Sequence, residues 1–347
     1  MHEHNIEIGP FVFASGERLE SVRQRITTYG DPHAPAVLVP HALTGSSRVR
    51  DWWGELVGEG KLLDPSRWYV IGINALGSCY GSSGPSTVAD FPYVTVRDIV
   101  AAQARALDAL GVHRLALVIG ASLGGMQALQ WALDFPARVE RAVMVGSHDH
   151  QSAMGIALNA IQREAIAVDP ARGLRIARKV AMLSYKSDAL FKHRHDRRAD
   201  RKGRFRFDVE GYLEHQADVF EARMDPRSYV ALTEAMDSFD VRNYATQTRH
   251  SQPPRHGELV ELRGEPVKPH REPPRHGELV EPRGEPVEPP HLLFVGISSD
   301  WLFLPQDVRA AARRFTTLGF ESDYVEIESD HGHDAFLAEP EVFASIL

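Results

Sequence analysis

The stretch that decides the fold of this chain is Leu115-Ala-Leu-Val-Ile-Gly-Ala-Ser-Leu-Gly-Gly-Met-Gln-Ala-Leu-Gln-Trp131. Its first five residues form the apolar run of a buried strand, and Gly124–Leu133 has the composition of an apolar helix. Between them, Gly120–Gly124 matches the G-x-S-x-G pattern, in which a tight strand-to-helix turn lifts a serine hydroxyl clear of the sheet. In this context we interpret Ser122 as a nucleophile rather than as a serine that merely begins a helix.

Outward from this stretch, short β-branched and apolar runs alternate with longer helical patterns. The runs that predict buried strands are Ala36–Val39, Tyr69–Ile73, Leu115–Ile119, Val143–Val145, Leu292–Val295 and Tyr324–Ile327. Val96–Leu110 predicts a further helix, with alanine and leucine at helical spacing. Such alternation predicts a mostly parallel sheet flanked by helices, and together with the serine turn it predicts the α/β-hydrolase fold.

Two segments interrupt the alternation and divide the chain. Residues 1–149 and 291–347 are predicted to form the two parts of the α/β core, and residues 150–250 a helical lid. The amphipathic patterns in the lid are Gly155–Val168, Leu174–Leu183, Gly211–Arg223 and Ser228–Phe239. Residues 251–290 repeat the sequence Pro-Pro-Arg-His-Gly-Glu-Leu-Val-Glu, from Pro253 and again from Pro273. Because each copy offers few apolar residues, we predict a disordered surface insertion.

Composition excludes several classes of partner. The 347 residues carry a formal net charge of -8, which argues against nucleic acid. The basic run from Lys192 to Arg206 is interpreted as a solvated surface, with a site for an anionic cosubstrate as the alternative. With one cysteine (Cys79), no signal-peptide pattern and no run of about 20 apolar residues, we expect a cytoplasmic protein that does not enter a membrane.

A serine hydroxyl needs a base to take its proton and a carboxylate to orient that base. In this fold the acid and then the histidine follow the serine, each after a later strand. Asp300 follows the penultimate predicted strand, and His331 and His333 follow the last. Asp300 and His333 are therefore the candidate acid and base, while spacing alone leaves His331 as a competing base. Asp307 and Asp323 fit less well, because they lie in an apparent helix and at the start of a strand.

The tetrahedral oxyanion formed by attack on a carbonyl needs two backbone N–H donors. One is expected from Leu123, the residue after the nucleophile. The other is expected from the loop Pro40–Gly45, where Leu43 is the candidate and Ala42 the second choice. His41 in the same loop is interpreted as a packing or bracing residue.

Beyond these motifs, the chain resembles the homoserine O-acetyltransferase family of methionine biosynthesis. The matching stretches are His41–Gly45, Trp52-Trp53, Asn74–Pro85, Gly120–Trp131, Asn159–Ile166, Gly211–Gln216, Ser299–Phe303 and Gly332–Leu337. They cover nearly the whole chain outside the repeat insertion. The resemblance implies Ser122 as nucleophile, Asp300 as acid and His333, not His331, as base.

The resemblance also implies how substrates are bound. Arg178 and Asp334 are implied to bind homoserine, and a guanidinium suits the carboxylate of an amino acid as a carboxylate suits its ammonium. Leu302 stands where some relatives carry an arginine associated with succinyl-CoA, so a leucine there resembles the acetyl-CoA users. The chain departs from the family after Asp169-Pro170, where a Trp- and Gly-rich stretch with a tyrosine is replaced by Ala171-Arg172 alone.

The expected reaction is transfer of an acetyl group from acetyl-CoA to the hydroxyl of L-homoserine, by a ping-pong route through acetyl-Ser122. No metal or cofactor is expected besides the CoA substrate, and the resemblance implies a homodimer formed through the lid helices. The main alternative is a carboxylesterase with the same triad, because the shortened lid would let water reach the acyl-enzyme. Further alternatives are a relative that uses succinyl-CoA or accepts serine, and a non-catalytic binding protein, which the complete triad disfavours.

Overall fold

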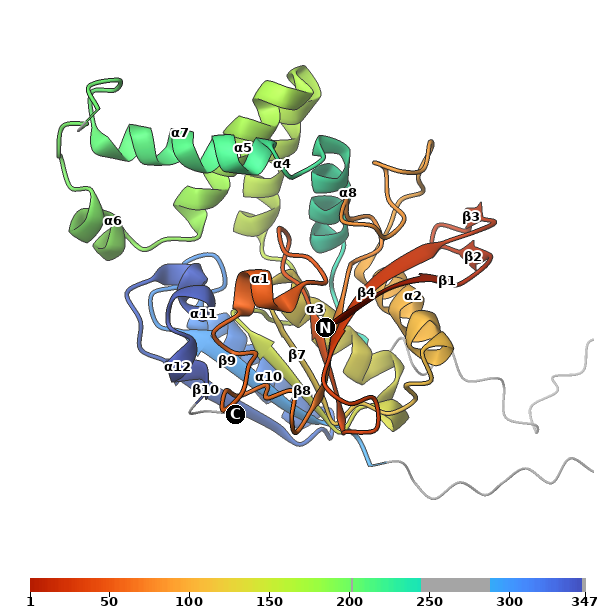
Figure 1. Ribbon diagram of the computed structural model, residues 1–347. Coiled ribbons are helices and arrows are strands. Elements are labelled where there is room, and N and C mark those ends of the chain that lie inside the picture. Colours follow the sequence, from red (N-terminus) through yellow and green to blue (C-terminus); the bar gives the residue numbers. More distant parts are fainter. Residues whose placement is uncertain (201, 245–287, 345–347) are drawn as a thin grey trace, which may run out of the picture.

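The computed structural model describes residues 1–200, 202–244 and 288–344. All but the last three residues of the predicted repeat insertion (251–290) therefore lie outside the described residues. At the centre is a sheet with the strand order β1-β4-β6-β5-β7-β8-β9-β10 (Figure 1). Its strands are β1 (His2–Glu7), β4 (Arg23–Tyr29), β5 (Ala36–Pro40), β6 (Tyr69–Ile73), β7 (Leu117–Ala121), β8 (Arg141–Val145), β9 (His291–Ile297) and β10 (Ser322–Ile327).

The sheet is parallel from β6 to β10, and β1 and β4 form its antiparallel edge. The short hairpin of β2 (Phe11–Val12) and β3 (Arg18–Leu19) forms a separate two-stranded sheet. A mostly parallel sheet flanked by helices confirms the predicted fold class. The β1–β4 segment was not predicted as strand.

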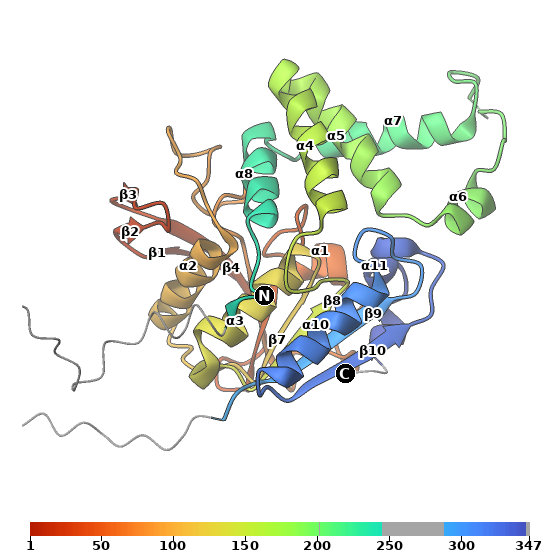
Figure 2. The same cartoon turned by 180° about the vertical axis from the view of Figure 1, so that it is seen from behind.

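Both faces of the sheet are buried, and successive residues of a strand enter different cores. In β5, Leu38 belongs to one hydrophobic cluster, while Val37 and Val39 belong to the other. The first cluster is closed by α2 (Val96–Ala109), α3 (Leu123–Asp134) and α10 (Pro305–Thr317), which lie in front of the sheet in Figure 2. The second is closed by α1 (Val49–Trp53), α11 (Ala335–Ala338) and α12 (Pro340–Ala344), on the face toward the viewer in Figure 1. Burial on both faces explains why the central strands are continuous apolar runs.

Between β8 and β9 the chain forms a helical layer over one edge of the sheet, which we call the helical insertion (Figures 1 and 2). It consists of α4 (Ala153–Val168), α5 (Pro170–Ser184), α6 (Asp188–Arg194), α7 (Asp208–Glu221) and α8 (Pro226–Asp237). None of the helices in the described part of the chain is long and apolar enough to cross a membrane.

A single residue, Asp169, separates α4 from α5. Asp169 ends α4 and caps α5, because its side chain accepts a hydrogen bond from Arg172 N at 3.0 Å. Pro170 occupies the first turn of α5, where its missing N–H costs nothing. A Cβ atom on Gly173 would lie 2.1 Å from Ala165 O, so only glycine lets the two helices approach this closely.

Candidate active site

Ser122 occupies a strained turn between β7 and α3. Its φ of 55° and ψ of -124° are rare for a residue with a side chain. Ser122 N donates to Val145 O of the neighbouring strand β8 at 2.9 Å, which anchors the turn to the sheet. Flanking glycines are required: a Cβ on Gly120 would lie 2.2 Å from Gly124 O, and one on Gly124 would lie 2.4 Å from Pro40 O. The structure therefore supplies the strand–turn–helix geometry that the motif predicts.

Asp300 and His333 form a buried hydrogen-bonded pair. The carboxylate Oδ2 accepts from the imidazole Nδ1 at 2.7 Å, so Nδ1 carries the proton. Asp300 Oδ1 accepts from the backbone N–H groups of Leu302 at 2.9 Å and Phe303 at 3.0 Å, which fixes the carboxylate. His333 Nε2 is buried and has no partner among the described residues. That nitrogen is thus in the state required of a general base.

The serine and this pair meet at the same edge of the sheet. Ser122 follows β7, Asp300 follows β9 and His333 follows β10, and these strands run parallel with β8 between the first two. Gly146 follows β8, and a Cβ there would lie 3.3 Å from His333 Nδ1 and 3.4 Å from Asp300 Oδ2. Because Val145 also holds Ser122 N, the β8 end lies between the candidate nucleophile and its partners.

The environment of His333 sets its basicity. Burial lowers the pKa of His333, but the charge and hydrogen bond of Asp300 act the other way, and the net effect raises it above the ordinary value of 6.5. Phe303 stacks on the ring at a centroid distance of 5.1 Å, and Phe336 meets it edge-on at 5.6 Å. These contacts hold the imidazole in one orientation.

The other predicted candidates for acid and base lie elsewhere. His331 Nδ1 is 3.1 Å from the carboxylate of Glu339 and makes no contact with Asp300. Asp307 lies in α10, and Asp323 in β10 pairs with His291 at 2.8 Å. The structure thus brings His333, and none of the alternatives, to Asp300.

The loop after β5 is braced by His41. Its ring is fully buried, with Nδ1–H donating to Ala42 O at 2.7 Å and Nε2 accepting from Ala75 N at 2.9 Å. Burial lowers the pKa of His41 to about 4, so the ring is neutral at physiological pH. Gln127 of α3 donates to His41 O at 3.1 Å and ties this loop to the helix that begins after Ser122. These contacts hold Leu43, the proposed oxyanion donor, in a buried position.

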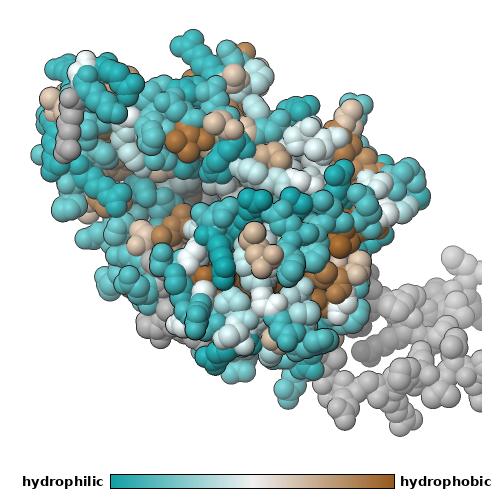
Figure 3. Space-filling model, in the orientation of Figure 1, coloured by the Kyte–Doolittle hydropathy of each residue, from teal (hydrophilic) through white to brown (hydrophobic). Residues whose placement is uncertain are grey.

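A cavity of about 600 Å³ separates the helical insertion from the core beside this loop. Figure 3 shows the hollow between the two parts on this face. The cavity is lined by Arg25, Ala42, Thr44, Gly45, Ser46, Ser47, Arg48, Asp51, Trp52, Tyr80, Arg178, Arg223, Phe336 and Leu337. Phe336 connects it to the candidate triad, because its ring also contacts that of His333.

Arg178 contributes donors to this cavity. Its Nη2 donates to Gln216 at 3.3 Å, while its Nε and Nη1 are buried without a partner among the described residues. The guanidinium lies over the ring of Phe220, 5.0 Å from its centroid. Unpaired guanidinium donors away from water are costly, and an anionic ligand would satisfy them.

The other two residues that the resemblance implied are already engaged. Asp334 forms an ion pair with Lys186 at 2.7 Å, and both side chains are largely shielded from solvent. Asp334 N also donates to Tyr185 O, and the Tyr185 ring lies 5.7 Å from that of His333. Leu302 is buried in the core and does not line the cavity. The sequence pointed to neither Lys186 nor Tyr185, which directly follow α5, the helix that carries Arg178.

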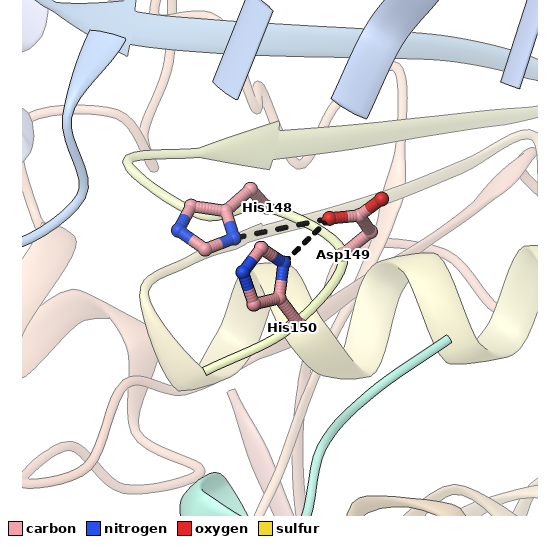
Figure 4. Close-up of side chains that lie close together, drawn as sticks. All are labelled: His148, Asp149 and His150. Atoms are coloured by element: carbon pink, nitrogen blue, oxygen red, sulfur yellow. Dashed lines mark hydrogen bonds and ion pairs between the residues drawn. The ribbon is translucent and has the colours of Figure 1, made fainter. Parts of the chain in front are cut away.

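A histidine–aspartate cluster lies in the loop after β8 (Figure 4). In the described ranges, His148, Asp149 and His150 are the one group of three with metal-ligand spacing, their ligand atoms lying within 4.8 Å of one another. His150 Nδ1 is 2.9 Å from Asp149 Oδ1, and the other carboxylate oxygen pairs with Arg314. That guanidinium opposes a divalent cation, so we interpret the group as an ion-pair network that buttresses the loop after β8.

The sheet order and the strained serine turn define an α/β-hydrolase-fold protein, and the family model described as alpha/beta hydrolase fold matches residues 35–340. The chain is 35% identical to a homoserine O-succinyltransferase of Aromatoleum aromaticum, over 97% of this chain and 92% of the relative. It is 36% identical to a homoserine O-acetyltransferase of Acidiphilium cryptum, over 94% and 88%. The chain therefore belongs to the homoserine O-acyltransferase family.

Solved structures agree on the fold. Homoserine O-acetyltransferase from Staphylococcus aureus matches with a TM-score of 0.78 at 27% identity, covering 99% of this chain and 93% of that one. The esterase E22 matches with a TM-score of 0.80 at 20% identity, covering 99% and 98%. At that identity the likeness to the esterase shows the shared fold alone.

Proposed function

We propose that the chain transfers an acetyl group from acetyl-CoA to the hydroxyl of L-homoserine, and so acts in methionine biosynthesis in the cytoplasm. Membership of the family supports O-acylation of homoserine. The observation that carries the proposal is the buried, unpaired donor set of Arg178 in the cavity beside the triad. A simple ester offers this guanidinium no charge, whereas the carboxylate of an amino acid does.

The proposed mechanism has two half-reactions. In the first, His333 Nε2 takes the proton of Ser122 Oγ, which attacks the thioester carbonyl. The N–H groups of Leu43 and Leu123 stabilise the oxyanion. The C–S bond then breaks, and the thiolate of CoA leaves as a thiol with the proton from His333. In the second, His333 takes the proton of the homoserine hydroxyl, whose oxygen attacks the carbonyl of acetyl-Ser122. The bond from this carbonyl to Ser122 Oγ then breaks, His333 returns the proton to Oγ, and O-acetylhomoserine leaves.

Homoserine is proposed to bind between Arg178 and Asp334. The guanidinium binds its carboxylate and the Asp334 carboxylate binds its ammonium. Since Asp334 is paired with Lys186 in the free protein, the ammonium of homoserine has to displace another ammonium, an exchange that leaves the carboxylate paired. The exchange distinguishes an amino acid from an uncharged alcohol.

Acetyl-CoA is proposed as donor because Leu302 stands where the resemblance places an arginine in some succinyl-CoA users; the residue itself is buried and does not line the cavity. Relatives of both donor types are about equally similar in sequence, so the donor rests on this residue. The specific observation that favours an esterase instead is the short turn at Asp169–Arg172, which removes a segment from the cover of the acceptor site.

The nucleophile is tested by mass spectrometry. Mixing the wild-type protein with acetyl-CoA should add one acetyl group at Ser122, and succinyl-CoA should label it far less. Ser122→Ala should show no adduct, and kcat should fall on the order of 10³-fold or more. Acetylation of another residue would overturn the assignment of Ser122 as nucleophile. Equal labelling by succinyl-CoA would overturn the assignment of acetyl-CoA as donor.

A further inference from the structure

The cavity beside the candidate triad is strongly basic in an otherwise acidic chain. Among the described residues that line it, Arg25, Arg48, Arg178 and Arg223 face a single carboxylate, that of Asp51. The whole chain carries a formal net charge of -8, so this concentration of guanidinium groups is not a consequence of composition. Arg178 is needed for the acceptor in the function proposed above. The other three have no role in that mechanism.

We propose that Arg25, Arg48 and Arg223 bind the phosphate groups of the acyl donor, so that these three side chains determine how much more tightly CoA is held than pantetheine, its phosphate-free part. This inference rests on the proposed function, because it concerns the donor of the same reaction. Guanidinium groups bind phosphate with paired N–H donors and stay charged at any physiological pH.

Arg25 and Arg48 are held together by Glu3. Arg25 Nη2 is 2.9 Å from one oxygen of Glu3, and Arg48 Nε is 2.6 Å from the other. Two guanidinium groups on one carboxylate leave a net positive charge at the cavity mouth. The Nη groups of Arg48 have no hydrogen-bond partner in the described part of the chain, and half of its side chain is exposed. Glu3 thereby positions the two arginines and leaves donors for a ligand.

Arg223 supplies positive charge from the helical insertion. It lies just after α7, and its Nη1 donates to Thr44 O and to the Tyr80 hydroxyl, both at 2.7 Å. Thr44 belongs to the loop that carries the proposed oxyanion donor Leu43. The guanidinium therefore joins the helical insertion to the loop at the reacting end.

The cavity gives the donor a path between these groups. At its inner end Ala42 and Phe336 adjoin the oxyanion loop and the ring of His333. At its outer end Arg48 precedes α1, which lies on the side of the core that faces the helical insertion in Figure 1. A thioester at Ser122 would thus have its phosphates at the arginines, with the uncharged pantetheine arm along Trp52. Binding energy from this remote part of the donor would be available for catalysis.

Equilibrium binding to the full-length protein tests the inference without relying on activity. Calorimetric titration should show CoA binding at least about 30-fold more tightly than pantetheine, which lacks every phosphate. Arg48→Ala should weaken CoA roughly tenfold and leave pantetheine unchanged. Arg48→Lys should recover part of the loss. Arg50→Ala is the matched control, because Arg50 lies two residues further on in α1 and is exposed but does not line the cavity.

Competition separates phosphate from carboxylate recognition. Adenosine 3′,5′-bisphosphate should displace CoA, and succinate should not. Equal affinities for CoA and pantetheine, an unchanged CoA affinity in Arg48→Ala, or displacement by succinate alone would overturn the inference.

Kinetics distinguish failure of the inference from failure of the proposed function. The inference alone fails if S-acetylpantetheine acylates Ser122 as efficiently as acetyl-CoA while homoserine still accelerates deacylation. The proposed function alone fails if CoA binds more tightly than pantetheine through Arg48 but homoserine never accelerates deacylation.

Discussion

His333 is the residue whose protonation the proposed chemistry depends on, because only the neutral ring can take the serine proton. Burial lowers its pKa and Asp300 raises it, with a net rise above 6.5. The value of kcat/KM for acetyl-CoA should therefore fall as the pH drops through a midpoint above 6.5. In Asp300→Asn the raising charge is lost while burial remains, so the midpoint should move to lower pH, and kcat should fall on the order of 10⁴-fold. An unshifted acid limb in this variant would contradict the assignment of Asp300.

Gly146 tests how closely the β8 end approaches the Asp–His pair. Gly146→Ala would place a Cβ 3.3 Å from His333 Nδ1 at a φ of +50°, so we expect both lost activity and roughly 1–3 kcal/mol of lost stability. Gly111→Ala is the matched control, since Gly111 also has a positive φ (+78°) but nothing within 4 Å of its Cβ position. It should lose stability without losing kcat. Thermal unfolding and acetylation rates should be measured for both variants. Equal activities of Gly146→Ala and Gly111→Ala would contradict the close approach of the β8 end to the Asp–His pair.

The sequence predicted those site residues whose positions depend on strand order. Ser122, Asp300 and His333 each follow a strand with a recognisable apolar run, so their meeting at one sheet edge follows from parallel topology. Lys186 and Tyr185 could not be found in this way. They reach the site through the path of the chain after α5, which no local pattern specifies.

Among the elements, the central strands were predictable and the edge strands were not. β6 is buried along its whole length and therefore forms a continuous apolar run. β1 alternates between exposed and half-buried positions and carries mostly polar residues, so its sequence gives no comparable signal. The helix α6 was also missed, because its second half is the basic sequence Lys192–Arg194.

An apolar stripe on α4 bears on the proposed homodimer. Met154, Ile161 and Val168 are spaced by seven residues and are 56%, 54% and 85% exposed, and seven-residue spacing places them on one side of the helix. On α5, Ile176 and Leu183 repeat the spacing and are also exposed. Unpaired apolar stripes of this kind suit association with a second copy of the chain.

A negative charge introduced into this stripe by substitution should therefore dissociate the proposed dimer. Ile161→Asp should convert the protein to a monomer in light scattering after size-exclusion chromatography, because a carboxylate cannot be buried unpaired in the interface. Val12→Asp is the control, since Val12 is 60% exposed but lies on the β2–β3 hairpin. A wild-type monomer, or an Ile161→Asp dimer of unchanged affinity, would show that the stripe is not the interface.

For the whole molecule, we propose that the cavity between the helical insertion and the core selects an amino-acid acceptor over water. Arg178 comes from the insertion, whereas Ser122, Asp300 and His333 come from the core. In the proposed mechanism the insertion contributes only donor binding, through Arg223, to the first half-reaction, whereas the second also needs Arg178 of the insertion to bind the acceptor. Transfer and hydrolysis therefore differ in whether the helical insertion takes part in deacylation.

The most direct test is the deacylation rate of acetyl-Ser122 as a function of homoserine concentration. Homoserine should accelerate deacylation of the wild type. Arg178→Ala should leave acetylation by acetyl-CoA nearly intact, yet lower the acceptor kcat/KM by about 30- to 1,000-fold, the equivalent of about 2–4 kcal/mol for a lost charge-assisted bidentate contact. Arg172→Ala, on the exposed start of the same helix, should behave as wild type. A wild-type rate that stays flat up to millimolar homoserine would contradict the transferase assignment and favour the esterase.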